Sequence, residues 1–110
     1  MKKVLIFFVT LFWSLSALAG EAAPGKLHTV GSAAWAVLYF NTTGAHTGAP
    51  PCAQTTLGRF AINTSTPAGR VMAAQVFLLY AQGKMTKIYG SGTCDPAAPD
   101  SESVGIIHDL

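Results

Sequence analysis

The first nineteen residues set the size of the chain that remains to fold. They open with the basic start MKK, continue with an apolar run over Val4–Leu18, and end in Ala-Leu-Ala. Small residues such as Ala17 and Ala19 are typical of the site at which signal peptidase cleaves. The apolar run is shorter than the about 20 residues that a membrane-spanning helix needs. We therefore predict a cleaved signal peptide over residues 1–19, with an uncleaved anchor as the alternative.

Removal of this segment leaves a small and electrically neutral chain. We expect a disordered lead-in over residues 20–25 and one folded domain over residues 26–110. The formal charge of +2 includes Lys2 and Lys3, and without them five basic residues match the five acidic ones. Binding to nucleic acid needs clustered Lys and Arg side chains. We predict an exported bacterial protein, periplasmic or secreted, with no nucleic-acid partner and no stable membrane insertion after cleavage.

The two cysteines, Cys52 and Cys94, allow only one intramolecular pair. Disulfides persist in oxidising compartments, and small exported domains often need them because their cores are small. We therefore predict a Cys52–Cys94 disulfide. The alternative is that Cys94 acts as a nucleophile supported by Cys52 and the histidines.

Most of the remaining pattern indicates β-strands. In residues 34–40, Trp35, Val37 and Tyr39 share one face, and the other face is also apolar, so we expect this strand to be buried on both sides. Residues 26–30 and 34–40 form two strands or one long strand bent at Gly31. The loop Asn41–Pro51 follows, and further strands are predicted over residues 55–63, 84–92 and 103–110.

One helix is predicted over residues 67–82. Thr66 is a suitable N-cap, and Pro67 takes the first helical position, where its missing N–H has no cost. Gly83 suits the left-handed position after the last turn. The helix is apolar around most of its circumference, so we expect the rest of the protein to cover it on most sides.

The order of these elements predicts a mainly β protein with one helix. Three strands, a helix and two strands match a five-stranded Greek-key barrel of the oligonucleotide/oligosaccharide-binding (OB) kind. In such a barrel the helix lies between the third and fourth strands and closes the base. An open antiparallel sheet with one packed helix is the alternative.

The segment RFAINTSTPAGRVMAAQVFLLYAQGKMTKIYGSGTC, residues 59–94, resembles a set of small exported bacterial proteins, many without an assigned activity. The layout over residues 26–110 is also distantly similar to the B subunits of subtilase-type and pertussis-like toxins. Those subunits have the OB fold and recognise sialylated glycans. The resemblance implies the same Cys52–Cys94 disulfide. The sugar-contacting loops of these toxins do not align with this chain, so no binding residue is carried over.

Acidic and histidine side chains are the candidates for a metal site. Asp95, Asp100 and Glu102 could bind calcium, but their spacing and the two prolines between them favour a rigid solvated turn. The three histidines lack the spacing of zinc ligands, and we expect all of them to be solvated or at the surface: His28, His46 and His108. Gly90 to Gly92 lack the context of a nucleophile elbow and are expected to end a strand. We predict no metal and no cofactor.

Three aromatic residues, Trp35, Tyr39 and Tyr89, are the best ligand-binding candidates, because barrels of this kind bind ligands through aromatic side chains on strands. Core packing is the alternative for Trp35. No acid–base or nucleophile set is visible, so we predict that the protein is not an enzyme. The function predicted is a non-catalytic binding module for a glycan or a partner protein, with a structural or assembly subunit of a homo-oligomer as the alternative.

Overall fold

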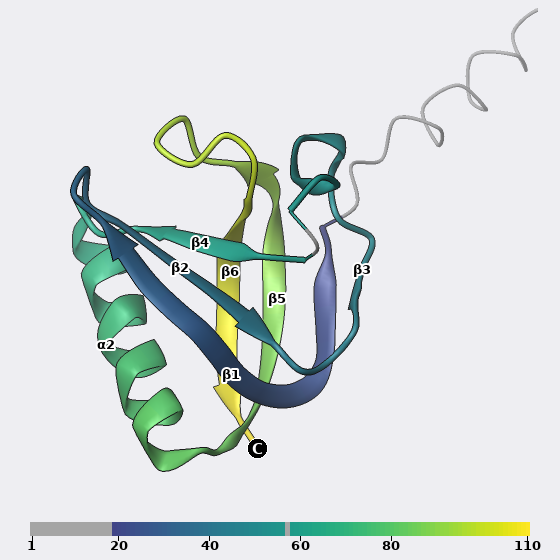
Figure 1. The fold of residues 1–110 in the computed structure, drawn as a ribbon, viewed down its shortest axis with the longest axis vertical. Coiled ribbons are helices and arrows are strands. Elements are labelled where there is room, and N and C mark those ends of the chain that lie inside the picture. Colours follow the sequence, from purple (N-terminus) through teal and green to yellow (C-terminus); the bar gives the residue numbers. More distant parts are fainter. Residues whose placement is uncertain (1–18, 57) are drawn as a thin grey trace, which may run out of the picture.

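The computed structural model describes residues 19–56 and 58–110, and within them the chain is mainly β with one helix (Figure 1). Most of the predicted signal peptide, and Leu57 of a predicted strand, lie outside the described residues. The elements in chain order are β1 (Glu21–Ala33), β2 (Val37–Thr42), β3 (His46–Thr47), the 3₁₀ turn η3 (Pro51–Ala53), β4 (Phe60–Asn63), α2 (Pro67–Gln82), β5 (Met85–Cys94) and β6 (Glu102–Asp109).

The six strands form one sheet in the order β2-β4-β6-β5-β1-β3, and β2 also pairs with β1. The strands β1, β2, β4, β6 and β5 therefore form a closed circuit of neighbours. Among the strand pairs of the described residues, β4–β6 is the parallel one, and the others are antiparallel. The long β1 closes the circuit, because Glu21 pairs with Tyr89 of β5 and Ala33 pairs with Val37 of β2. Its register shifts between His28 and Gly31, where we expected a bend.

Several predicted boundaries are corrected by the structure. Residues 21–25 of the expected disordered lead-in belong to β1, because β5 supplies hydrogen-bonding partners for them. The strand predicted over residues 34–40 is β2, shifted to residues 37–42, because residues 34–36 form a hairpin turn after β1. The strand predicted over residues 55–63 is limited to β4. The expected loop 41–51 contains β3, so the helix follows the fourth strand and not the third.

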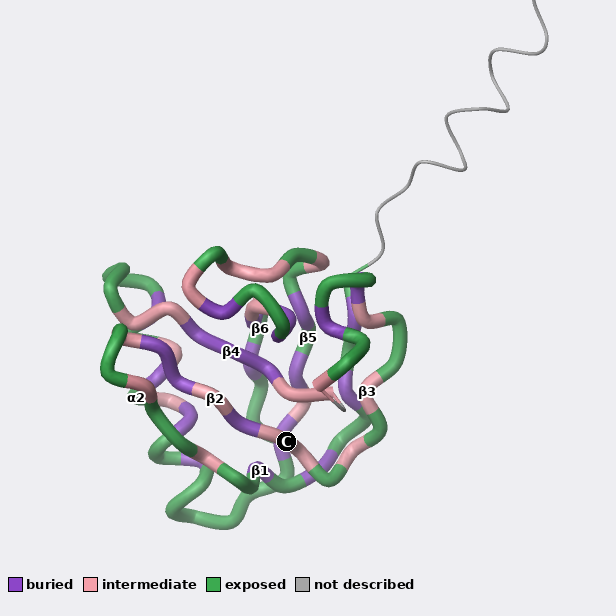
Figure 2. The backbone as a smooth tube through the Cα atoms, turned by 45° about the horizontal axis from the view of Figure 1, so that its top comes forward, coloured by how far each residue is buried: buried purple, intermediate pink, exposed green. Residues whose placement is uncertain are grey.

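The helix prediction is confirmed over residues 67–82. The Thr66 hydroxyl accepts a hydrogen bond from the backbone N–H of Gly69 at 3.0 Å, and Gly83 has a φ of 61°. Only one side of α2 is buried, through Gly69, Ala73, Val76 and Leu79. The expectation that α2 is covered on most sides is wrong, because the sheet reaches one face only; Figure 2 shows buried and exposed positions alternating along the helix.

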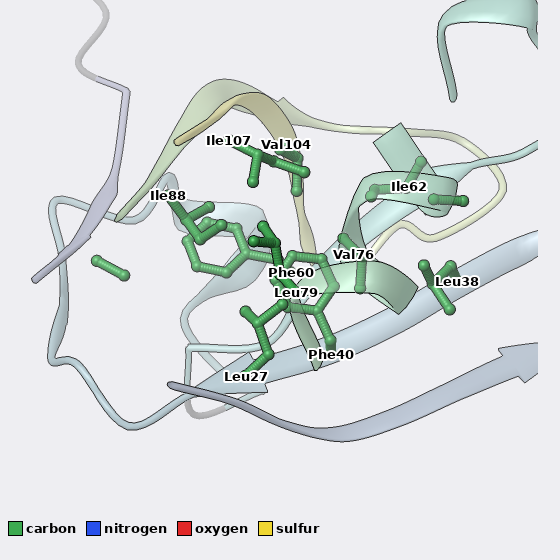
Figure 3. Packing of buried hydrophobic residues seen from close by; sticks show 12 residues of the cluster. Leu27, Leu38, Phe40, Phe60, Ile62, Val76, Leu79, Ile88, Val104 and Ile107 are labelled. Atoms are coloured by element: carbon green, nitrogen blue, oxygen red, sulfur yellow. The ribbon is translucent and has the colours of Figure 1, made fainter. Parts of the chain in front are cut away.

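The main core lies between α2 and the inward faces of the strands (Figure 3). Phe40 of β2 and Phe60 of β4 stack at its centre, with ring centroids 5.8 Å apart. Val76 and Leu79 reach this pair from α2, and Ile88 reaches it from β5. The side chains that point inward from β2 are Leu38 and Phe40. Burial of these apolar side chains supplies the main driving force for folding.

A second, smaller cluster covers the outward face of β2 and β4. Residues Asp95–Ser101, which we call the acidic loop, fold back over Val37 and Ala61, and Ala98 is completely buried there. The prediction that the strand over residues 34–40 is buried on both faces is therefore confirmed for residues 37–40, with Tyr39 partly exposed, and is wrong for Trp35, which is exposed. The prediction that the loop is a solvated turn is wrong for Ala98, which packs against the sheet.

Candidate functional site

The predicted disulfide between Cys52 and Cys94 is confirmed. Cys52 lies in η3, Cys94 lies at the end of β5, and their sulfur atoms are bonded at 2.17 Å. The crosslink ties the segment that leads into β4 to the start of the acidic loop. Because both sulfur atoms are consumed in this bond, neither cysteine is available as a nucleophile.

The three acidic side chains near the acidic loop face three different partners. Asp95 accepts hydrogen bonds from the Asn63 side-chain amide at 3.2 Å and from the backbone N–H of Ala97 at 2.8 Å. Asp100 pairs with the Arg59 guanidinium at 2.9 Å. Glu102 points into the protein. Over residues 19–56 and 58–110, no group of three or more His, Cys, Asp or Glu side chains could hold a metal ion.

Glu102 is a fully buried acid with three partners, which together form what we call the Glu102 pocket. Its Oε1 lies 2.8 Å from Nε2 of His46, whose side chain is only 5% exposed. Its Oε2 accepts hydrogen bonds from the backbone N–H of Gly20 at 2.8 Å and of Gly92 at 2.9 Å. A buried carboxyl group needs such partners, because an unpaired charge away from water is strongly destabilising.

The hydrogen bonds define where the protons of His46 lie. Its Nδ1 is 3.0 Å from the carbonyl oxygen of Gly58, which can only accept, so Nδ1 carries a hydrogen atom. A second hydrogen atom lies between Nε2 of His46 and Oε1 of Glu102, which are 2.8 Å apart. The expectation that His46 is solvated is wrong, because β3 turns the ring inward to stack on Phe60 at 4.2 Å.

Glycines make room for the buried carboxyl group. A Cβ atom at Gly20 or at Gly90 would overlap the carboxyl group of Glu102. Gly92, with a φ of 85°, presents its N–H to the same group. The Gly-Ser-Gly stretch of β5 is therefore a cradle for Glu102. Local sequence does not indicate this role, because these glycines and Glu102 meet only when β5 pairs with β6.

The three aromatic candidates divide between two places. Trp35 lies in the β1–β2 turn, 62% exposed, and its Nε1 donates a hydrogen bond to the carbonyl oxygen of Ala97 at 2.9 Å. The alternative prediction, that Trp35 packs in the core, is therefore wrong. Tyr39 lies on the outward face of β2, where the Arg59 guanidinium stacks 4.3 Å from its ring centroid. Tyr89 lies on β5, which is not a neighbour of β2 in the sheet.

Tyr89 has its own polar surroundings. The Lys87 ammonium group lies 5.1 Å from its ring centroid, and the His108 ring meets it edge-on at 6.2 Å. His28 and His108 are exposed on β1 and β6, as predicted. Tyr89 therefore belongs to the outward face of β5 and β6, and it forms no single site with Trp35 and Tyr39.

The best-formed hollow in the described part of the chain is small. It lies beside the N-terminus of α2, has a volume of about 180 Å³, and is lined by Asn63, Thr66, Met72, Asp95 and Ser103 among others. Sites for small organic ligands usually have volumes of about 300–1,000 Å³. This hollow is therefore too small to enclose a drug-sized ligand.

The outward side of α2 is apolar and exposed. Val71, Phe77 and Leu78 are exposed by 71%, 51% and 57%, although each is a large apolar side chain. Their spacing places them on one side of the helix together with two small residues, and we call this set the outer α2 face: Val71, Ala74, Phe77, Leu78 and Ala81. In the described ranges, no helix combines the length and apolar character needed to cross a membrane.

Comparisons of this chain with protein-family models, with curated proteins and with solved structures found no match.

Proposed function

We propose that this protein is an exported, non-catalytic binding module built on a five-stranded, OB-like barrel. The barrel is supported by the circuit β1-β2-β4-β6-β5, in which the parallel β4–β6 pair joins the two halves. The two-residue β3 lies outside this circuit, so α2 falls between the third and fourth strands of the barrel. Export is supported by the Cys52–Cys94 disulfide, because such bonds persist outside the reducing cytoplasm.

The observation that carries the binding function is the outer α2 face. Large apolar side chains that gather on one exposed surface mark interaction sites more often than scattered ones do. Arg70 is the one charged side chain on this side of α2, and its guanidinium is held by the backbone carbonyls of Thr64 and Ser65. The surface therefore offers a partner a mainly apolar contact, with Arg70 as its one charged group.

The occupant that fits this face best is a second copy of the chain. Permanent interfaces between subunits are the most hydrophobic class, whereas transient partners meet through more polar surfaces. Ala74 and Ala81 are small, so a facing helix could approach closely between Phe77 and Leu78. The protein is then an assembly subunit whose helices pack against one another.

Light scattering on the exported, purified protein tests this proposal. We expect a multiple of the monomer mass, and we expect Leu78→Lys to reduce it to the monomer by placing a charge in the interface. Leu110→Lys is the matched control, since Leu110 is also exposed but lies at the C-terminus. A monomeric wild type at all concentrations, or a Leu78→Lys assembly of unchanged mass, would refute self-association.

A second candidate function, oligosaccharide binding, rests on Trp35. OB barrels bind such ligands on the face of their second and third strands, with the loop between strands 1 and 2 and the loop between strands 4 and 5. Trp35 lies in the first of these connections and donates its hydrogen bond to Ala97 in the other. The indole ring is thereby held at the surface through Ala97, which packs against the same outward cluster as Tyr39.

Tryptophan fluorescence tests this candidate directly. Trp35 is the one tryptophan after residue 19, so a ligand that stacks on it changes the emission of the processed protein. Sialylated oligosaccharides are the first probes, because the resemblance to toxin B subunits implies them. We expect saturable quenching that Tyr89→Ala leaves unchanged. No change of emission across a glycan panel, together with an empty glycan array, would refute this candidate.

A further inference from the structure

The bond between Ala19 and Gly20 lies at the edge of the Glu102 pocket. Ala19 is exposed and Gly20 is buried. The backbone nitrogen of Gly20 donates to Oε2 of Glu102 at 2.8 Å, and its carbonyl oxygen accepts from the backbone N–H of Gly90 at 2.7 Å. The sequence predicts signal-peptide cleavage at this same bond. We propose that cleavage after Ala19 creates an N-terminal ammonium group on Gly20, which the Glu102 carboxylate captures inside the folded protein.

The covalent step is hydrolysis by a signal peptidase. The oxygen of one water molecule joins the carbonyl carbon of Ala19, the bond from that carbon to the Gly20 nitrogen breaks, and the leader departs with a terminal carboxylate. Both protons of the water end on the Gly20 nitrogen, which becomes an ammonium group at neutral pH. Because Gly20 is buried in the folded protein, cleavage precedes folding and the new terminus is captured as the sheet forms.

The pocket favours a charged donor at this position. In the uncleaved chain, the Gly20 nitrogen is a neutral amide that donates to a buried carboxyl group. A hydrogen bond between an ammonium group and a carboxylate is about twice as strong as a neutral one. Arg59 is engaged by Asp100 and by the hydroxyl of Ser101, and neither of these contacts involves Glu102. The Gly20 ammonium and His46 are therefore the two cationic partners of Glu102.

The pocket also selects the residue that follows the cleaved bond. A Cβ atom at position 20 would overlap Oε1 of Glu102 and lie 2.7 Å from Nε2 of His46, so glycine is required. Cleavage one residue earlier would leave the ammonium group on exposed Ala19. Cleavage one residue later would remove the donor to Oε2. The stability of the folded protein thus depends on cleavage at one particular bond.

The test compares two exported proteins that differ in the position of the terminal amine. The full chain is expressed with its own leader, and intact mass is expected to give Gly20 as the first residue. A variant with one alanine inserted between Ala19 and Gly20 carries its amine one residue away and keeps an amide at Gly20. We expect its melting temperature to fall by about 4–8 °C, the shift expected in a domain of this size when the charge-assisted hydrogen bond to Glu102 is weakened to one with a neutral amide donor.

Two further variants separate the pocket from general effects. In Glu102→Gln, the alanine insertion should no longer change the melting temperature, whereas Glu21→Gln should leave the effect of the insertion intact, since Glu21 is exposed.

If Glu102→Gln fails to fold, amine acylation of the wild type replaces it. We expect the Gly20 amine to react with an amine-acylating reagent at least about tenfold more slowly in the folded than in the urea-unfolded protein, because the charged amine is not nucleophilic. An N-terminus other than Gly20, an insertion without effect on melting, or equal acylation rates would overturn the proposal.

Discussion

Removal of the Cys52–Cys94 disulfide is the perturbation whose magnitude the structure defines best. The two cysteines are 42 residues apart, and the loop that they close contains β4, α2 and nearly all of β5. In the chain-entropy model, a crosslink over this length removes enough freedom from the unfolded chain to stabilise the folded state by about 4 kcal/mol. Domains of this size have total stabilities of about 5–15 kcal/mol, so the crosslink supplies a large share.

The Cys52→Ser/Cys94→Ser double variant removes this crosslink with little other change. Cys52 is exposed and Cys94 half-buried, so serine at these positions costs little in packing. We expect the free energy of unfolding to fall by about 4 kcal/mol in urea titrations and the melting temperature to fall by about 15–30 °C. Wild-type protein reduced with dithiothreitol is the control, and its stability should agree with that of the variant within about 1 kcal/mol.

A loss below about 1 kcal/mol would refute this reasoning, because the unfolded chain would then gain little freedom when the loop opens. If the double variant is unfolded in buffer, titration with a stabilising osmolyte recovers the folded state and allows extrapolation to zero osmolyte. A variant that stays unfolded in the osmolyte, while the reduced wild type folds, would place the loss in the serine substitutions and contradict the entropic account.

Four further outcomes follow from the contacts described above. Phe60→Ala should destabilise the protein by about 3–5 kcal/mol in urea titrations, because it removes the ring that stacks on Phe40 and His46; Phe60→Leu should cost less. His46→Ala should cost about 3–5 kcal/mol at pH 7 by leaving Oε1 of the buried Glu102 without its partner, whereas His28→Ala at an exposed site should be close to neutral by the same measurement. Thr66→Ala should lower stability by about 1 kcal/mol through loss of the helix cap, and Thr66→Ser should restore it. Calorimetric titration with Ca²⁺ should give no saturable heat, since the acids near the acidic loop face separate partners; measurable binding there would contradict the geometry.

Features that depend on neighbouring residues could be predicted from the sequence. The bounds of α2 followed from Thr66, Pro67 and Gly83, because a helix begins and ends through contacts within one turn. The disulfide needed only the count of two cysteines. Apolar side chains on both faces predicted a strand buried on both sides, which holds for residues 37–40, but they did not predict that the acidic loop covers the outward side.

Features that depend on which distant segments pack or pair with one another could not be predicted in this way. The expectation that α2 is covered on most sides failed because hydrophobic periodicity shows that a face is apolar but not whether other elements reach it. Similarly, β3 is two residues long and forms only because β1 lies beside it. The loop-like composition around His46 therefore predicted a solvated ring. In the structure, the pairing of β3 with β1 points this ring toward the core.

The sequence by itself determined the mainly β composition of the chain, the position of its helix and the pairing of its cysteines, because each depends on local chemistry or on a count. The tertiary structure alone decided which surfaces stay exposed and where the charged groups lie. Gly20 and Glu102 are separated by 82 residues, and His46 and Glu102 by 56, so no local pattern relates them. They meet because β3, β1, β5 and β6 pair in one particular register, and hydrogen bonds act only over about 3 Å.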